Sequence, residues 1–153
     1  MNLFILTQAD GNPVADKTAA AVVSVTDDTQ VGDLGNLVLG DSEPLVVKFT
    51  TGTAAPAFAG DGTYTLSVSL GAVTSGGTQN SASASGLTVI TGGWSGRLAL
   101  TGTDLIAAVN TAGGGACASR GGEFTLQVRV SDPSGYTVTY ALLPVFIEWR
   151  VPA

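Results

Sequence analysis

The chain has 153 residues, of which 44% are apolar and only 12% are charged, and its formal net charge is −6. A chain of this length can bury one hydrophobic core, so we expect a single domain that spans residues 1–153. Its six basic residues form no cluster, so the sequence predicts no positive patch that could bind a phosphate backbone. We therefore expect no nucleic-acid partner.

The N-terminal segment begins with Asn2–Thr7, a short β-type run that ends before the turn-prone residues 10–13. The next stretch, Val14–Asp28, contains an alanine run that suits a helix, but its valines favour a strand. We predict that residues 1–30 form an N-terminal arm or an edge strand used in assembly. The segment has too few consecutive apolar residues for a signal peptide, so we expect no export. No stretch has the roughly 20 apolar residues of a membrane span, so we expect no membrane insertion.

Several strands are predicted in the central part of the chain. Pro44–Thr50 is one strand, and Thr63–Leu70 alternates so cleanly that its even-numbered apolar residues should face the core. The small, polar stretch Gly71–Gly86 is either a loop or a thin polar strand. Leu87–Thr91 and Trp94–Leu100 are separated by two glycines, a pattern that predicts a β-hairpin.

One short helix is predicted at residues 103–110. Thr103 suits the N-cap, Asp104 suits the positive end of the helix dipole, and Leu105, Ile106 and Val109 share a face. The helix should end at Asn110, before a glycine-rich stretch that contains Cys117, the single cysteine of the chain. We expect it to connect two strands as a crossover.

The C-terminal part is predicted to form two or three strands. In Phe124–Val130 and Tyr136–Leu142 the even-numbered residues should share one buried face. Between these strands, residues 132–135 (Asp-Pro-Ser-Gly) favour a sharp turn. The run Val145–Val151 alternates again, with Trp149 on the inward register, where it would serve the core or a subunit interface, and Phe146 on the outward register. Together these elements predict an all-β fold, an antiparallel β-sandwich of about seven to nine strands with one crossover helix.

The residue types that most enzymes use are scarce in this sequence. The chain has no histidine and one cysteine, which removes His-based catalysis and Cys-rich zinc sites. Asp27, Asp28 and Asp33 do not match a calcium-loop spacing, and we interpret them as a solvated turn. Asp41 and Glu43 offer a carboxylate pair of a kind that any acidic protein offers. We therefore predict no catalytic residues, no cofactor and no metal site.

Two kinds of binding residue are considered. Trp94 follows a Gly-Gly turn, where an indole could stack on a sugar, although core packing is the more frequent role of tryptophan. Strands at a sheet edge can add to the sheet of a neighbouring chain, and Asn2–Thr7 and Val145–Val151 are the candidates. The predicted interface residues are Phe4, Leu6, Phe146, Glu148, Trp149 and Arg150.

Two runs of the sequence resemble a known class of proteins. They are GLTVITGGWSGRLALTGTDLIAAV (Gly86–Val109) and FTLQVRVSDPSGYTVTYALLPVFIEWRV (Phe124–Val151), and the earlier segment GDSEPLVVKFT (Gly40–Thr50) fits the same pattern. They resemble small structural proteins of tailed bacteriophages, found among tail-tip, baseplate and fibre proteins. The Gly-rich stretch around Cys117 departs from that pattern.

The resemblance implies a non-enzymatic virion protein that assembles as an oligomer in the tail, baseplate or fibre apparatus, as an adaptor or fibre-base module. A head-decoration or capsid-fibre protein is the first alternative. A carbohydrate-binding module for adsorption to the host is the second, with a host-surface glycan as partner. The expected partners are other virion proteins and copies of the chain itself. The expected location is the virion, after synthesis in the bacterial cytoplasm.

Overall fold

The computed structural model describes residues 2–7, 20–24, 36–74, 77–101 and 121–148, and every regular element within them is a β-strand. The all-β class predicted from the sequence is therefore confirmed. The helix predicted at residues 103–110 lies outside the described residues. The strands are β1 (Asn2–Thr7), β2 (Ala20–Ser24), β3 (Asn36–Val38), β4 (Ser42–Thr50), β5 (Thr65–Thr74), β6 (Gly77–Ile90), β7 (Gly93–Ala99), β8 (Gly121–Ser131) and β9 (Thr137–Glu148).

These strands form one mixed sheet in the order β2-β1-β4-β7-β6-β5-β8-β9-β3. Most neighbours are antiparallel, but β1 runs parallel to β4, and β3 runs parallel to β9. The predicted antiparallel pairing is therefore found for most neighbouring strands and is wrong for these two pairs. The alternation of apolar residues along a strand reports which face is buried, whereas strand direction depends on the connections between strands.

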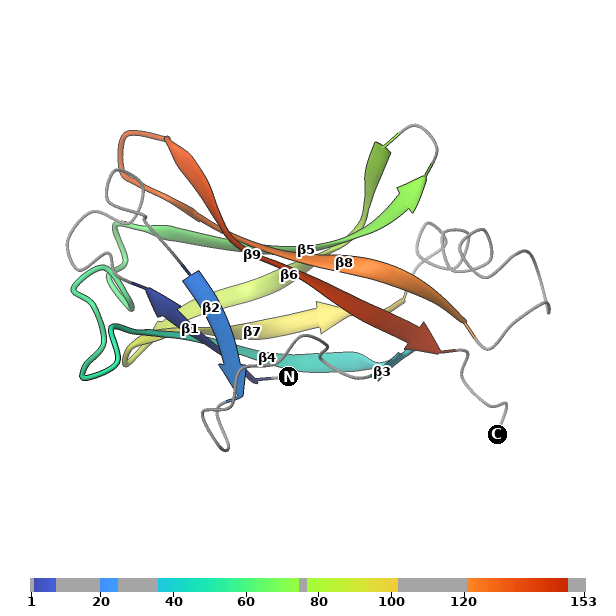
Figure 1. Cartoon of the computed structure of the whole chain (residues 1–153), viewed down its shortest axis with the longest axis horizontal. Coiled ribbons are helices and arrows are strands. Elements are labelled where there is room, and N and C mark those ends of the chain that lie inside the picture. The colour runs from blue at the N-terminus through green and yellow to red at the C-terminus, as the bar shows by residue number, and fades with distance from the viewer. Residues whose placement is uncertain (1, 8–19, 25–35, 75–76, 102–120, 149–153) are drawn as a thin grey trace.

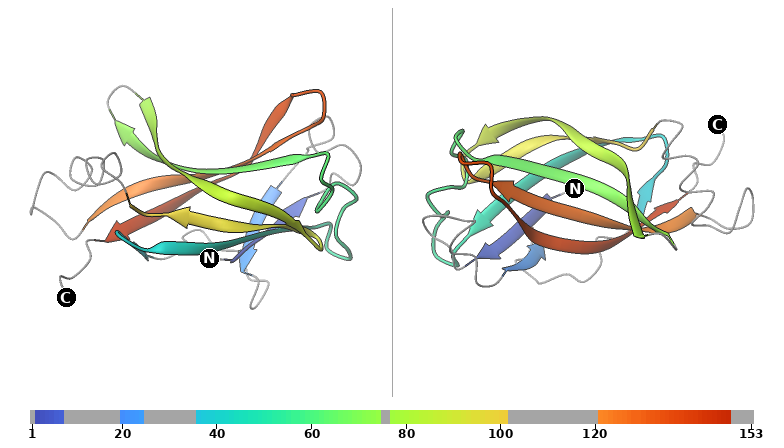
Figure 2. Two further views of the ribbon diagram at one scale, coloured as in Figure 1. Left: turned by 180° about the vertical axis from the view of Figure 1, so that it is seen from behind. Right: turned by 90° about the horizontal axis from the view of Figure 1, so that it is seen from above.

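The sheet is curled, so that β5 and β8 lie opposite β4 and β7 (Figures 1 and 2). The long strand β6 makes the curl, because its residues 77–83 pair with β5 while its residues 84–90 pair with β7. The side that contains β1, β4 and β7 is called the β4 half below, and the side that contains β5, β8 and β9 is called the β8 half.

The turn between β3 and β4 connects the two halves at the opposite side of the molecule. The Leu39 amide donates a hydrogen bond to the carbonyl of Glu148 on β9, at 2.9 Å. Two residues later, the carbonyl of Asp41 accepts a hydrogen bond from the Leu100 amide at 2.8 Å, just after β7. The backbone of this turn therefore links β9 to the end of β7.

The core lies between the two halves and is continuous. The predicted inward residues of Thr63–Leu70 and Phe124–Val130 are confirmed, because the even-numbered residues from Leu66 to Leu70 and from Phe124 to Val130 are buried. Its aromatic centre is Phe49, whose ring packs edge-on against Phe58 at 5.2 Å and Tyr140 at 5.3 Å. Side chains from both halves thus meet at Phe49.

The inward face predicted for Tyr136–Leu142 is wrong for part of that strand. Tyr140 is buried as expected, but Leu142 is 63% exposed. The register shifts because Val128 pairs with Ala141 while the next residue, Arg129, pairs with Thr139. This β-bulge adds one residue to β9, so Tyr140 and Ala141 are both buried and the following alternation is inverted. Leu143 then faces the core and Leu142 faces solvent.

The turn between β8 and β9 has the structure that its sequence predicts. The Asp132 carboxylate accepts hydrogen bonds from the amides of Ser134 and Tyr136, each at 3.0 Å. Gly135 has a φ of 89°, a left-handed conformation that glycine adopts without strain. The side chain of Asp132 thus holds the turn by satisfying two backbone donors.

Replacing Asp132 with alanine should lower the free energy of unfolding by about 1–2 kcal/mol, because both amide hydrogen bonds are lost at an exposed turn. Asp132→Asn should recover most of this stability, because its side-chain carbonyl can accept the same bonds. Urea denaturation followed by tryptophan fluorescence measures both changes. Equal losses in the two variants would show that the carboxylate charge, rather than the hydrogen-bond geometry, stabilises the turn.

Candidate functional site

An apolar row faces solvent on the outer surface of β9. It consists of Leu142, Pro144 and Phe146, which alternate with the buried residues Leu143, Val145 and Ile147. Leu142 and Pro144 are exposed, and Phe146 is partly buried. We call these three residues the β9 row. Leu142 is the one large exposed hydrophobic of the row, and apolar groups in line on the outer face of a strand suit a contact surface.

Charged and aromatic residues lie at the two ends of the β9 row. Glu148 follows Phe146 on the same face of β9. Beyond the other end, Arg129 is exposed on β8 and pairs with Thr139 of β9. Tyr136, in the adjoining turn, is 71% exposed. The row therefore lies between a cation and an anion on one outer surface.

The residues predicted as an interface lie on both halves of the sheet. Phe4 and Leu6 face outward from β1, with Phe4 partly buried and Leu6 40% exposed. The backbone of β1 pairs with β2 on one side and β4 on the other, so this strand offers no free edge for strand addition. Phe146 and Glu148 are both partly buried on β9, where residues 146–148 pair with β3. Trp149 and Arg150 lie outside the described residues.

The structure describes some of the other residues that the sequence suggests for a functional site. Trp94 is 3% exposed and packs edge-on against Phe49 at 6.1 Å, so its indole presents no open face to a sugar. Asp41 is exposed in the turn before β4, and Glu43 is partly buried on that strand. The predicted calcium-loop carboxylates and Cys117 lie outside the described residues.

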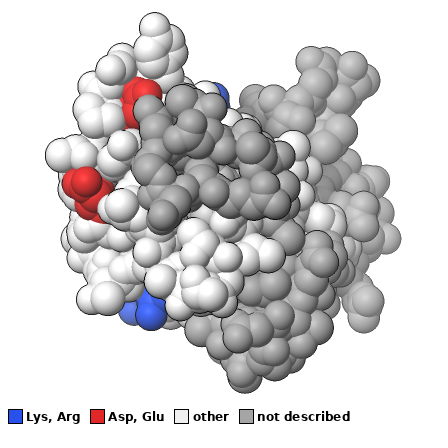
Figure 3. Space-filling view, turned by 60° about the vertical axis from the view of Figure 1, so that its left-hand side comes forward, with Lys and Arg blue, Asp and Glu red and all other residues white. Residues whose placement is uncertain are grey.

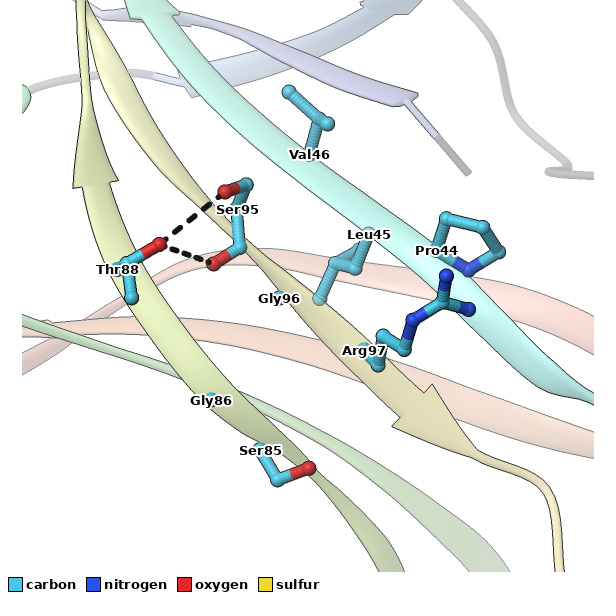
Figure 4. Close-up of a pocket in the computed structure, with 9 residues that line it drawn as sticks. All are labelled: Pro44, Leu45, Val46, Ser85, Gly86, Thr88, Ser95, Gly96 and Arg97. Atoms are coloured by element: carbon cyan, nitrogen blue, oxygen red, sulfur yellow. Dashed lines mark hydrogen bonds between the residues drawn. The ribbon is translucent and has the colours of Figure 1, made fainter.

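An open hollow of about 480 Å³ lies on the outer surface of the β4 half (Figure 4). More of its lining is apolar than polar, and we call it the polar hollow after the hydroxyl and guanidinium groups around it. Its lining comes from three strands: β4 contributes Pro44, Leu45 and Val46, β6 contributes Ser85, Gly86 and Thr88, and β7 contributes Ser95, Gly96 and Arg97. We call the two glycines its floor, because they have no side chains. None of the sequence patterns described above predicts this hollow. The repeated Ser-Gly steps at 85–86 and 95–96, on the two strands of a predicted hairpin, are the signal that could have revealed it.

The hydrogen bonds of the hollow hold its polar side chains in place. The Thr88 hydroxyl lies 3.4 Å from the Ser95 hydroxyl and donates to the Ser95 carbonyl at 3.5 Å. The Arg97 guanidinium donates through Nη1 to the carbonyl of Ser42 at 2.9 Å, which holds it against β4. A guanidinium has five N–H donors, so this contact leaves donors for a ligand.

Charge is sparse over the described surface. Among the described residues in Figure 3 most of the surface is uncharged, with separated acidic side chains and basic groups at the lower edge and near the top. Within the ranges that the structure describes, no three His, Cys, Asp or Glu residues lie close enough to hold a metal ion. No helix in those same ranges is long and apolar enough to cross a membrane. A comparison with protein families and with curated proteins finds no match to this chain.

Proposed function

We propose that this chain is a non-enzymatic structural protein of a tailed-bacteriophage virion, and that it acts as an oligomer in the tail, baseplate or fibre apparatus. The resemblance of Gly86–Val109 and Phe124–Val151 to such proteins supports the virion assignment. The proposal that the chain forms an oligomer rests on the β9 row, with its exposed Leu142 and its flanking charges.

The occupant that best fits the β9 row is a second copy of the chain. Arg129 pairs with position 139 of β9, and Glu148 lies nine residues further along that strand. The middle of this interval falls between Leu142 and Pro144. A two-fold axis through that point would place Arg129 of each copy near Glu148 of the other and would pack the two rows together. Such self-complementarity is what a two-fold interface requires.

We also propose the finer features of the fold that the sequence predicts. The two facing halves would act as the layers of a β-sandwich, and residues 103–110 would form the crossover helix before β8. The capping pattern of Thr103 and the apolar face of Leu105, Ile106 and Val109 support the helix. Residues 1–30 would contribute to assembly through the outward Phe4 and Leu6 of β1. Carbon chemical shifts from NMR would test the helix directly.

Charge reversal tests the proposed two-fold contact. Arg129→Glu and Glu148→Arg should each weaken self-association about tenfold, because each places like charges opposite one another across the axis. The double variant should restore association, since the exchanged charges again face each other. Sedimentation equilibrium measures the association constants. A double variant as weak as the single ones would contradict this contact.

A second pair of variants identifies the surface. Leu142→Lys should dissociate the oligomer, because it places a charge in the middle of the apolar row. Leu6→Lys tests the alternative contact on β1. Val89→Lys on β6 is the matched control and should leave the oligomer intact, because Val89 is exposed and lies outside both predicted contacts. If Leu6→Lys dissociates the oligomer and Leu142→Lys does not, the contact lies on β1 and the β9 row is not the interface.

A further inference from the structure

The polar hollow exists because of a second β-bulge. Ser85 pairs with Arg97 and Thr88 pairs with Ser95, so two residues of β6, Gly86 and Leu87, lie opposite the single residue Gly96. The Leu87 side chain packs against the core, and a Cβ atom on Gly96 would meet its Cδ2 at 2.9 Å. Gly86 has a φ of 62°, and a Cβ there would have nothing within 4 Å. The floor of the hollow is therefore open at Gly86.

The groups around this floor suit a ligand with hydroxyls and a negative charge. Ser85, Thr88 and Ser95 provide three hydroxyl groups. Those of Ser85 and Ser95 can donate and accept a hydrogen bond, whereas that of Thr88 donates to the Ser95 carbonyl and can accept. Arg97 is the one charged side chain that lines the hollow, and a guanidinium matches a carboxylate in geometry. Pro44 and Val46 form an apolar edge on β4. The volume of about 480 Å³ lies within the usual range of small-molecule sites.

The local charge also favours an anion, although the whole chain is acidic. Lys48 and Arg97 both occupy outward positions on the β4 half. In the pairing of β4 with β7, Lys48 lies opposite Gly93 and Arg97 lies opposite Pro44. In β1, β4, β6 and β7 the one acidic residue is Glu43, which shares the inward register of Leu45 and Val47. The outer faces of those four strands therefore carry cations and no anion, and the exposed Asp41 lies just before β4, next to the Ser42 that Arg97 contacts.

We infer that the polar hollow binds a saccharide that carries a carboxylate, such as a uronic acid unit of a surface polysaccharide. The guanidinium of Arg97 binds the carboxylate, the three hydroxyls bind the sugar hydroxyls, and the C–H face of the ring packs against Pro44 and Val46. This site is on the other half of the sheet from the β9 row. A failure of saccharide binding would therefore leave the assembly proposal unchanged, and the reverse also holds.

Titration of the full chain with a galacturonic acid trimer, monitored by amide NMR shifts, tests this inference. We expect saturable shifts centred on Thr88, Ser95 and Arg97. Arg97→Gln should weaken binding at least about tenfold, which corresponds to 1.4 kcal/mol. Lys48→Gln removes a cation from the same outer surface that does not line the hollow, and it should weaken binding much less than Arg97→Gln. Gly86→Asn should abolish binding without unfolding, because asparagine tolerates a left-handed φ and fills the floor.

Three results would overturn the inference. Equal binding of a neutral galactose trimer would show that the carboxylate plays no part. Equal binding of citrate would show that the hollow recognises carboxylates without a saccharide. A Lys48→Gln variant that binds as weakly as Arg97→Gln, with shifts that map away from the hollow, would show that the contact is non-specific charge attraction.

Discussion

Replacing Phe49 with alanine should lower the free energy of unfolding by about 3–5 kcal/mol, the cost of removing a large buried aromatic side chain. Phe49 is 1% exposed and lies at the centre of an aromatic cluster. Its ring contacts Phe58 at 5.2 Å, Tyr140 at 5.3 Å and Trp94 at 6.1 Å, all edge-on. The cavity would open between the β4 half and the β8 half, where Tyr140 approaches from β9.

Urea denaturation of wild type and variant measures this loss. Phe49→Leu is the matched control and should lose less, because it keeps most of the buried apolar volume while removing the edge-to-face contacts. A loss below about 1 kcal/mol for Phe49→Ala would mean that the two halves do not meet at this ring.

Gly93→Ala should destabilise the protein by about 3 kcal/mol or more, because overpacking against a backbone cannot be relieved by a rotamer change. Gly93 is buried at the start of β7 and pairs with Lys48 of β4. A Cβ at this position would overlap the carbonyl oxygen of Val47 and lie 2.9 Å from the Cα of Lys48. The methyl group would therefore force β4 and β7 apart and break their hydrogen bonds.

Gly135→Ala provides the comparison for this effect. Gly135 has a φ of 89°, and a Cβ there would meet no atom within 4 Å. Its replacement should cost only about 1–2 kcal/mol, the strain of a left-handed alanine. Thermal unfolding of the two variants side by side separates steric overlap from backbone strain. Equal losses would contradict the close approach of β4 and β7 at Gly93.

The sequence predicts the strands of this fold well, because the apolar alternation is strong and the turns have clear chemistry. Thr63–Leu70 and the Asp132–Gly135 turn are examples in which the local pattern and the structure agree. The alternation fails where a bulge inserts a residue. In β9 the pairing of Val128 with Ala141 and of Arg129 with Thr139 inverts the face of every later residue. Nothing in the alternation of Tyr136–Leu142 signals that insertion.

The candidate surfaces were harder to predict for related reasons. The alternation in the sequence predicts that Leu142 faces the core, and only Phe146 of the β9 row is predicted to face outward, because the bulge leaves no mark in the alternation. The polar hollow depends on Gly86 and Gly96 lying opposite each other on neighbouring strands. The sequence of a single strand does not determine which residues of its neighbour it pairs with. Trp94 was considered for both the core and a glycan, and its burial against Phe49 places it in the core.

Sedimentation velocity of the purified wild-type chain over a range of concentrations tests the central proposal most directly. An assembling structural protein with a self-complementary β9 row should sediment as a defined oligomer, and the oligomer should dissociate reversibly on dilution. A chain that stays a monomer up to about 100 µM would have an affinity too weak for that contact and would contradict the account.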